Sequence, residues 1–170
     1  MNVRTLVFAI TALALVGCGK SASQSAAESA VTVATGGKVQ VSQSGDQQQV
    51  TVKDGKGGEA KISVGGNVAL PKDFPSDVHL PASYTIRSAV TMPQGVVIDL
   101  HAPAAMQALY SEYDGTMKSA GWTEAMAMQS SQSESVLTFQ KDKRSVVVTI
   151  VATSDGGGSD VHVQSTSGQN

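Results

Sequence analysis

The sequence predicts an α+β fold in which an antiparallel sheet packs against one helix. All aromatic residues except Phe8 lie between residues 74 and 139. Because aromatic side chains bury the largest areas per residue, we expect the packed domain to span residues 71–166. Within that span, one stretch with helical periodicity interrupts runs of alternating residues, in the chain order β-β-α-β-β-β-β. Runs of strands around a single helix are typical of an α+β layer.

The predicted helix covers about residues 103–120. Its apolar side chains recur at helical spacing: Met106, Leu109, Tyr110, Tyr113, Met117 and Ala120. Pro103 is expected at the first helical position, where its missing N–H leaves no hydrogen bond unmade. Gly121 is expected as the C-terminal cap, and Trp122 as the apolar residue that packs back on the last turn.

Two predicted strands precede the helix. Residues 84–92 alternate and place four apolar side chains on one side: Tyr84, Ile86, Val90 and Met92. The tetrapeptide MPQG then supplies a turn with proline second and glycine fourth. Residues 96–101 return as a strand, with Asp99 and His101 on the side opposite its apolar residues.

Further strands are predicted after the helix. They are expected at residues 122–128, 136–141, 145–153 and 161–165. The run SVVVTIVAT at 145–153 is apolar on both faces, which indicates a central strand. The remaining residues, 167–170, are expected to form a short tail.

Residues 31–70 form a glycine-punctuated, low-complexity segment that predicts short and marginal strands. Three alternating pieces are separated by Gly-rich turn signals: Val39-Gln40-Val41, Val50-Thr51-Val52 and Ile62-Ser63-Val64. These pieces are too poor in apolar residues to form a core alone, so they either pair with an edge of the main domain or stay mobile. The three prolines of LPKDFPSDVHLP, residues 70–81, indicate an extended strap that leads into the domain.

Residues 1–17 have the features of a secretory signal peptide. The apolar stretch TLVFAITALAL follows Arg4 and is shorter than the roughly 20 residues that a membrane-spanning helix needs. The next residues, Leu15-Val16-Gly17-Cys18, resemble the bacterial lipobox. This resemblance implies cleavage between Gly17 and Cys18 and lipidation of the Cys18 thiol, with palmitate as one acyl chain. An ordinary signal peptide with an incidental cysteine is the alternative.

Lipidation of Cys18 would make the membrane the first partner of the chain. Each buried CH₂ of an acyl chain contributes about 0.8 kcal/mol, and more than one chain gives stable attachment. Residues 18–30, rich in Ser, Ala and Gln, match a disordered tether in composition. The residue after the cysteine is Gly19 and not Asp, which is similar to the sorting signal of outer-membrane lipoproteins. We therefore expect a location on the outer membrane, facing the periplasm.

Most of residues 70–165 resembles a group of small, uncharacterised secreted bacterial domains. KDFPSDVHLP is followed by a hairpin, a helix carrying Leu and Tyr, Gly121-Trp122 and a β meander. Members of that group read as DFP-x-DV-x-LP…Y…GW. The resemblance implies a periplasmic domain, and the group brings no known activity with it. The predicted helix on a curved sheet is also similar to helix-grip modules, several of which bind or assemble, but fold analogy does not establish function.

Charge and cysteine content exclude several function classes. The net charge of −2 gives no basic patch for nucleic acid. A single cysteine excludes an intramolecular disulfide and a Cys-rich zinc site. The histidines His79, His101 and His162 lack the spacing of a metal site, so we expect neither a metal nor a cofactor.

The expected function is binding without catalysis. Asp99 and His101 share one strand face, but no G-x-S-x-G nucleophile motif accompanies them, so we assign no catalytic residue and favour a hydrolase least. A carrier of a small molecule or lipid is the alternative. Its groove between helix and sheet would be lined by four residues: Tyr110, Tyr113, Met117 and Trp122. The leading expectation is an envelope lipoprotein that binds an unknown envelope protein or ligand.

Overall fold

The structure is a computed structural model and describes residues 38–53 and 58–168. The predicted signal peptide, the lipobox residues Gly17 and Cys18 and the tether lie outside these residues. The described chain forms nine strands and one helix. They are β1 (Lys38–Ser44), β2 (Gln47–Lys53), β3 (Glu59–Val64), β4 (Thr85–Met92), β5 (Gly95–Ala102), α2 (Met106–Ser119), β6 (Thr123–Gln129), β7 (Glu134–Lys141), β8 (Arg144–Ala152) and β9 (Ser159–Ser167).

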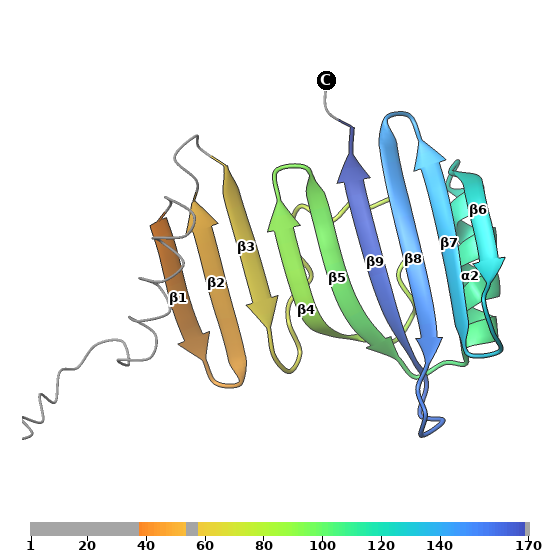
Figure 1. The fold of residues 1–170 in the computed structure, drawn as a ribbon, viewed down its shortest axis with the longest axis horizontal. Coiled ribbons are helices and arrows are strands. Elements are labelled where there is room, and N and C mark those ends of the chain that lie inside the picture. The colour runs from red at the N-terminus through yellow and green to blue at the C-terminus, as the bar shows by residue number, and fades with distance from the viewer. Residues whose placement is uncertain (1–37, 54–57, 169–170) are drawn as a thin grey trace, which may run out of the picture.

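All nine described strands join one antiparallel sheet (Figure 1). Their spatial order is β1-β2-β3-β4-β5-β9-β8-β7-β6. Strand β9, the last in the chain, lies between β5 and β8 and so joins the strands before the helix to those after it. The predicted class, an antiparallel sheet with a single helix, is confirmed for the described residues.

The sheet has three more strands than the predicted domain, so its chain order differs from the predicted one. Strands β1, β2 and β3 belong to the same sheet, which corresponds to the first of the two alternatives for residues 31–70, pairing with an edge of the main domain. Strand β3 pairs with β4 from Lys61 opposite Thr91 to Val64 opposite Ser88. These strands lack a core of their own, and the hydrogen bonds of the neighbouring strands supply the stability that an isolated hairpin lacks.

Helix α2 starts later than predicted and ends as predicted. Its N-cap, Ala105, has extended backbone angles (φ −65°, ψ 143°), so Pro103 lies before the helix and not at its first position. At the other end, Gly121 has φ 83°, and the Trp122 N–H donates to the Met117 carbonyl oxygen at 3.0 Å. This is the glycine-terminated helix end that the sequence predicts.

The hydrophobic core lies between α2 and one face of the sheet. Helix α2 covers β6, β7 and β8 (Figure 1). The largest fully buried side chains come from the helix and from the inner face of β5, β7 and β8: Tyr113, Phe139, Ile98, Leu100, Leu109, Met117, Leu137 and Ile150. Phe74 and Val78 of the strap are also buried in this cluster, so the strap forms part of the core.

The alternation of side chains along β4 is shifted by an irregularity between Ile86 and Ser88. Ile86 and Ala89 are both buried, whereas the prediction placed Val90 on the same side as Ile86. An extra residue at a β-bulge moves every later side chain to the opposite face. Val90 therefore lies on the face away from α2, and that part of the prediction is wrong.

The face of the sheet opposite α2 is called the open face. On β5, buried residues alternate with half-buried ones along the strand. Val96, Ile98 and Leu100 point into the core, and Asp99 and His101 point to the open face. This placement is as predicted.

Candidate functional site

The residues predicted to line a groove between helix and sheet belong to the core. Tyr113, Met117 and Trp122 are buried, and Tyr110 is half-buried against the same cluster. The ring of His79 packs edge-on against Tyr113, with 5.1 Å between the ring centroids. Burial raises the pKa of the Tyr113 hydroxyl above its ordinary value. These side chains fill the space between α2 and the sheet.

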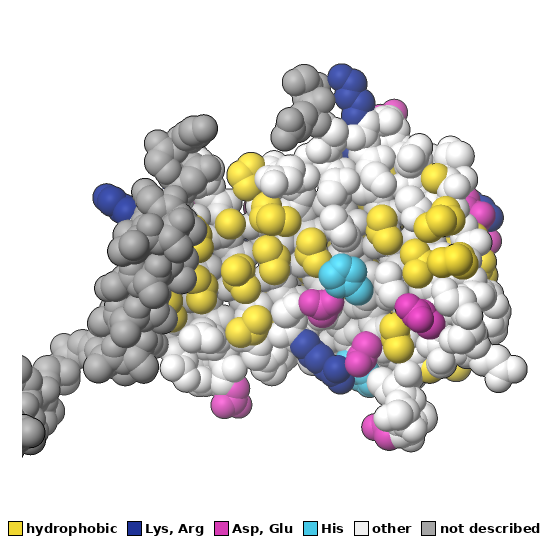
Figure 2. All heavy atoms as spheres, in the orientation of Figure 1, with side chains coloured by type: hydrophobic (Ala, Val, Ile, Leu, Met, Phe, Trp, Pro, Cys, Tyr) yellow, Lys and Arg dark blue, Asp and Glu magenta, His cyan; other side chains and the backbone are white. Residues whose placement is uncertain are grey.

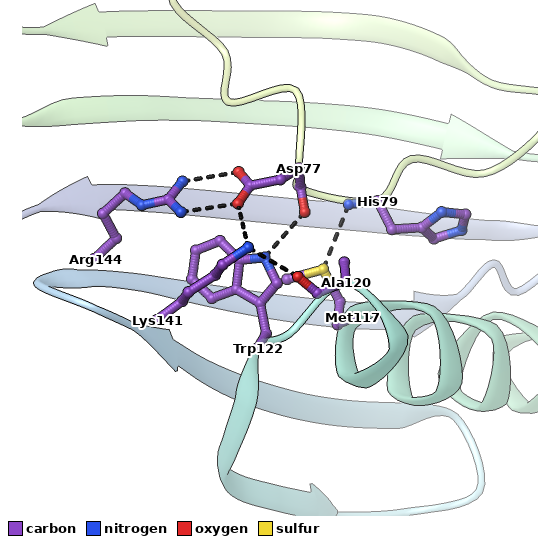
Figure 3. Close-up of polar contacts among 7 residues, drawn as sticks. All are labelled: Asp77, His79, Met117, Ala120, Trp122, Lys141 and Arg144. Atoms are coloured by element: carbon purple, nitrogen blue, oxygen red, sulfur yellow. Dashed lines mark hydrogen bonds and ion pairs between the residues drawn. The ribbon is translucent and has the colours of Figure 1, made fainter.

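The strap is fastened to the sheet by a group that we call the Asp77 clasp: Asp77, Trp122, Lys141 and Arg144 (Figure 3). The Arg144 guanidinium donates to both carboxylate oxygens of Asp77, each at 2.8 Å. Lys141 Nζ donates to Asp77 Oδ2 at 3.0 Å. A two-pronged arginine–carboxylate pair is among the stronger polar contacts in proteins, so the clasp holds the strap against the β7–β8 hairpin.

The clasp also holds the end of α2. The Trp122 indole N–H donates to the Asp77 carbonyl oxygen at 2.9 Å, and Lys141 Nζ donates to the Ala120 carbonyl oxygen at 2.8 Å. The Arg144 guanidinium lies 4.8 Å from the centroid of the Trp122 ring, within the range of a cation–π contact. Figure 3 shows these contacts converging between strap, helix and hairpin.

The clasp explains two of the motif elements in the sequence. Asp77 of the DFP-x-DV segment meets Trp122 of the GW pair, although the two residues lie far apart in the chain. The pKa of the Asp77 carboxyl is held well below its usual range by the hydrogen bond from Arg144, against the opposing effect of burial and with a further contribution from Lys141. These residues have a structural role.

A second polar group, the polar cluster, lies on the open face and contains Arg87, Asp99, His101, Asp160 and His162. Register places Asp99 opposite His162 and His101 opposite Asp160. Asp99 Oδ1 lies 2.6 Å from His162 Nδ1. Asp160 Oδ1 lies 3.0 Å from His101 Nδ1 and 3.0 Å from an Arg87 nitrogen. Four members of the cluster, all except His101, line a shallow hollow of about 220 Å³.

The polar cluster does not have the geometry of an activated nucleophile. Asp99 also accepts a hydrogen bond from the Ser88 hydroxyl at 2.5 Å, so the carboxylate lies between the serine and His162. Nucleophilic serine requires a histidine between the serine and the acid. Burial raises the pKa of Asp99, but the hydrogen bonds from Ser88 and His162 outweigh it and leave that pKa lowered. Asp99 and His101 share one face of β5, as predicted, and each contacts a residue of β9: Asp99 contacts His162, and His101 contacts Asp160.

The three histidines do not gather in one place. His79 Nε2 lies 2.9 Å from Glu112, whereas His101 and His162 belong to the polar cluster. In the part of the chain that the structure describes, no group of three metal-ligating side chains is close enough to hold a metal ion. Among the same residues, no helix has the length and apolar composition needed to cross a bilayer.

The open face also carries a row of aliphatic side chains, which we call the aliphatic ladder: Val50, Ile62, Val90 and Val97. Register places each opposite the next, from β2 to β5. Ile62 is 36% exposed and the others are half-buried. Figure 2 shows hydrophobic side chains over this part of the open face, with acidic, basic and histidine side chains near its middle. The bulge in β4 is what places Val90 in the row.

A groove of about 620 Å³ lies on the other face, between the strap and strands β2–β4. Its lining combines Val68 and Leu70 with the polar side chains of Gln49, Lys61 and Thr91. Helix α2 contributes no residue to this lining, so the groove is not the one that the sequence predicts. Its mixture of apolar and polar groups defines no single class of ligand.

No protein-family model matches the chain, and neither a curated protein nor a solved structure gives a match. The sites therefore have to be interpreted from their own chemistry. Three features were not predicted from the sequence: the Asp77 clasp, the pairing of Asp99 with His162 and the aliphatic ladder. The one local signal for the ladder was the alternation of β-branched residues in β2 and β3.

Proposed function

We propose that the protein is a lipid-anchored, non-catalytic binding module of the cell envelope, which holds a partner on the open face of its sheet. The lipobox-like residues that end at Cys18 support the anchor. A flexible tether of the length of residues 19–30 reaches about 20 Å, which allows the domain to stand off the membrane. The glycine after Cys18 favours the outer membrane and its periplasmic side.

The observation that carries this proposal is the aliphatic ladder. The solvent face of an antiparallel sheet normally carries polar side chains. Here a row of β-branched aliphatic side chains crosses four neighbouring strands and is partly exposed. Contiguous exposed apolar surface marks interaction sites on soluble domains. A protein partner fits this surface better than nucleic acid, because the chain carries a net charge of −2.

The polar cluster supports recognition over turnover. Its acids are already engaged by His101, His162, Arg87 and Ser88. Paired charges within an apolar surface favour one docking orientation more than they add affinity. In this proposal the ladder supplies contact area and the polar cluster sets the orientation.

Replacing Cys18 by serine tests the anchor. In bacterial cells fed an alkyne analogue of palmitate, the full-length chain is expected to incorporate the label and to fractionate with membranes. The Cys18→Ser variant is expected to lose the label completely, because the chain has no other cysteine. A Ser21→Ala variant serves as the matched control and is expected to keep the label. An unlabelled parent chain, or a labelled Cys18→Ser variant, would show that the thiol is not the site of lipidation.

A further inference from the structure

We propose that the partner held on the open face is a second copy of this chain, so that two sheets pack face to face about a two-fold axis. This inference rests on the proposed function and names its partner. Strand β5 is the middle strand of the nine in the described sheet. An axis near β5 places the open face of one copy against the same face of the other, which is the self-complementary arrangement of most dimers.

The shape of the open face suits a second sheet. The aliphatic ladder consists of β-branched side chains on a pleated surface, and two such surfaces interdigitate at a separation of about 10 Å. Near the far edge of the same face, Met126 and Met128 on β6 are exposed. Methionine side chains adapt to irregular surfaces, so this edge can accommodate the facing sheet as well.

The size of the open face matches the area that a stable dimer buries. On β1 the side chains that share this face, Val39 and Val41, are only 8% exposed, so the accessible part of the face runs from β2 to β6. Eight strands spaced by about 4.8 Å make this part roughly 35 Å wide, and strands of this length extend for about 25 Å. The accessible part therefore offers roughly 850 Å² per copy. A specific interface of standard size buries about 800 Å² per partner. A smaller ligand would leave most of this surface exposed.

The charges of the polar cluster favour a second copy over a partner of one charge sign. The cluster contains both acids and bases: Asp99, Asp160, Arg87, His101 and His162. It lies on β4, β5 and β9, close to the centre of the strand order. A partner with a single sign of charge would place like charges against each other, which is costly in an interface. A second copy, turned about the proposed axis, carries the same acids and bases, so charges of opposite sign can face each other.

Site-specific photo-crosslinking in the full-length chain tests this inference. The crosslinking residue replaces Gln164, which is exposed and lies opposite Val97 on the open face. In bacterial membranes, illumination is expected to give a product of twice the mass of the mature chain. When two differently tagged copies are expressed together, that product is expected to carry both tags. The matched control replaces Ser111, exposed on α2, and is expected to give no such product.

Charge on the open face is expected to reduce the yield of the crosslink strongly. The double variant Ile62→Lys and Val64→Lys changes two exposed positions, 36% and 38% accessible, and the yield at Gln164 should fall at least about tenfold, the change that corresponds to about 1.4 kcal/mol. The single variant Val64→Lys and a thermal melt of each variant show whether the fold is retained. An unchanged yield in folded variants would overturn the role of the face in dimer formation.

The mass of the product separates the two proposals. A product of any other mass overturns the second-copy inference and leaves the proposed binding function in place. If neither Gln164 nor a crosslinker at Thr138, on the same face, gives a product of any mass, both proposals are wrong.

Discussion

The Trp122→Ala variant is expected to lose about 3–5 kcal/mol of the free energy of unfolding, the range for removal of a large buried aromatic side chain. Trp122 is 3% exposed and belongs to both the core and the Asp77 clasp. Its removal leaves a cavity beside Arg144 and deprives the Asp77 carbonyl oxygen of the hydrogen bond from the indole N–H. Urea denaturation followed by circular dichroism measures the loss.

The Trp122→Phe variant separates packing from hydrogen bonding. Phenylalanine keeps an aromatic ring but cannot donate to the Asp77 carbonyl oxygen, so the expected loss is smaller, about 1–2 kcal/mol. If Trp122→Ala costs less than about 1 kcal/mol, Trp122 does not fasten the strap and helix as described.

The Asp77→Asn variant is expected to lose about 1.5–3 kcal/mol of the free energy of unfolding at neutral pH, the typical contribution of a hydrogen bond to a charged group. The change keeps the shape of the side chain but removes the charge that Arg144 and Lys141 contact. Because the pKa of Asp77 is depressed in the folded protein, its contribution is full above the unfolded pKa of about 4 and is lost as the pH falls towards the folded pKa. The difference in unfolding free energy between the parent chain and the variant should therefore be constant from pH 7 to pH 5 and become smaller below about pH 4.

A surface ion pair in the same sheet provides the control for Asp77. Lys53 and Glu59 contact each other at 3.1 Å, but both side chains are largely exposed. Exposed pairs contribute about 0–1 kcal/mol, so Glu59→Gln should change the unfolding free energy by less than Asp77→Asn does. Two results would contradict the role of the clasp. One is an equal loss of unfolding free energy in the two variants, and the other is a loss in Asp77→Asn that does not change with pH.

Local sequence signals predicted the features that depend on nearby residues. The spacing of Leu109, Tyr113 and Met117 predicted which side of α2 is buried. Gly121 and Trp122 predicted how the helix ends, since that motif is set by a few consecutive residues. The alternation on β5 predicted that Asp99 and His101 face away from the core.

Features set by pairing between distant strands were not predicted. One extra residue between Ile86 and Ser88 places Val90 on the open face. The sequence alone contains no signal that predicts this bulge. The insertion of β9 beside β5 placed His162 opposite Asp99, because register depends on the whole sheet. The Asp77 clasp and the aliphatic ladder also join residues that lie far apart in the chain, so the sequence did not show that these residues meet. Cys18 lies outside the described residues and stays a prediction.

We propose that a partner covers the open face when the chain is anchored to the membrane. Carbene footprinting of the full-length chain in native membranes tests it at three side chains of similar exposure: Ile62 (36%) and Val64 (38%) on the open face, and Leu70 (40%) on the strap. We expect Ile62 and Val64 to be labelled several-fold less than Leu70, because the partner excludes the reagent from the open face only. Equal labelling of the three side chains would show that the open face is bare and would contradict the proposed function.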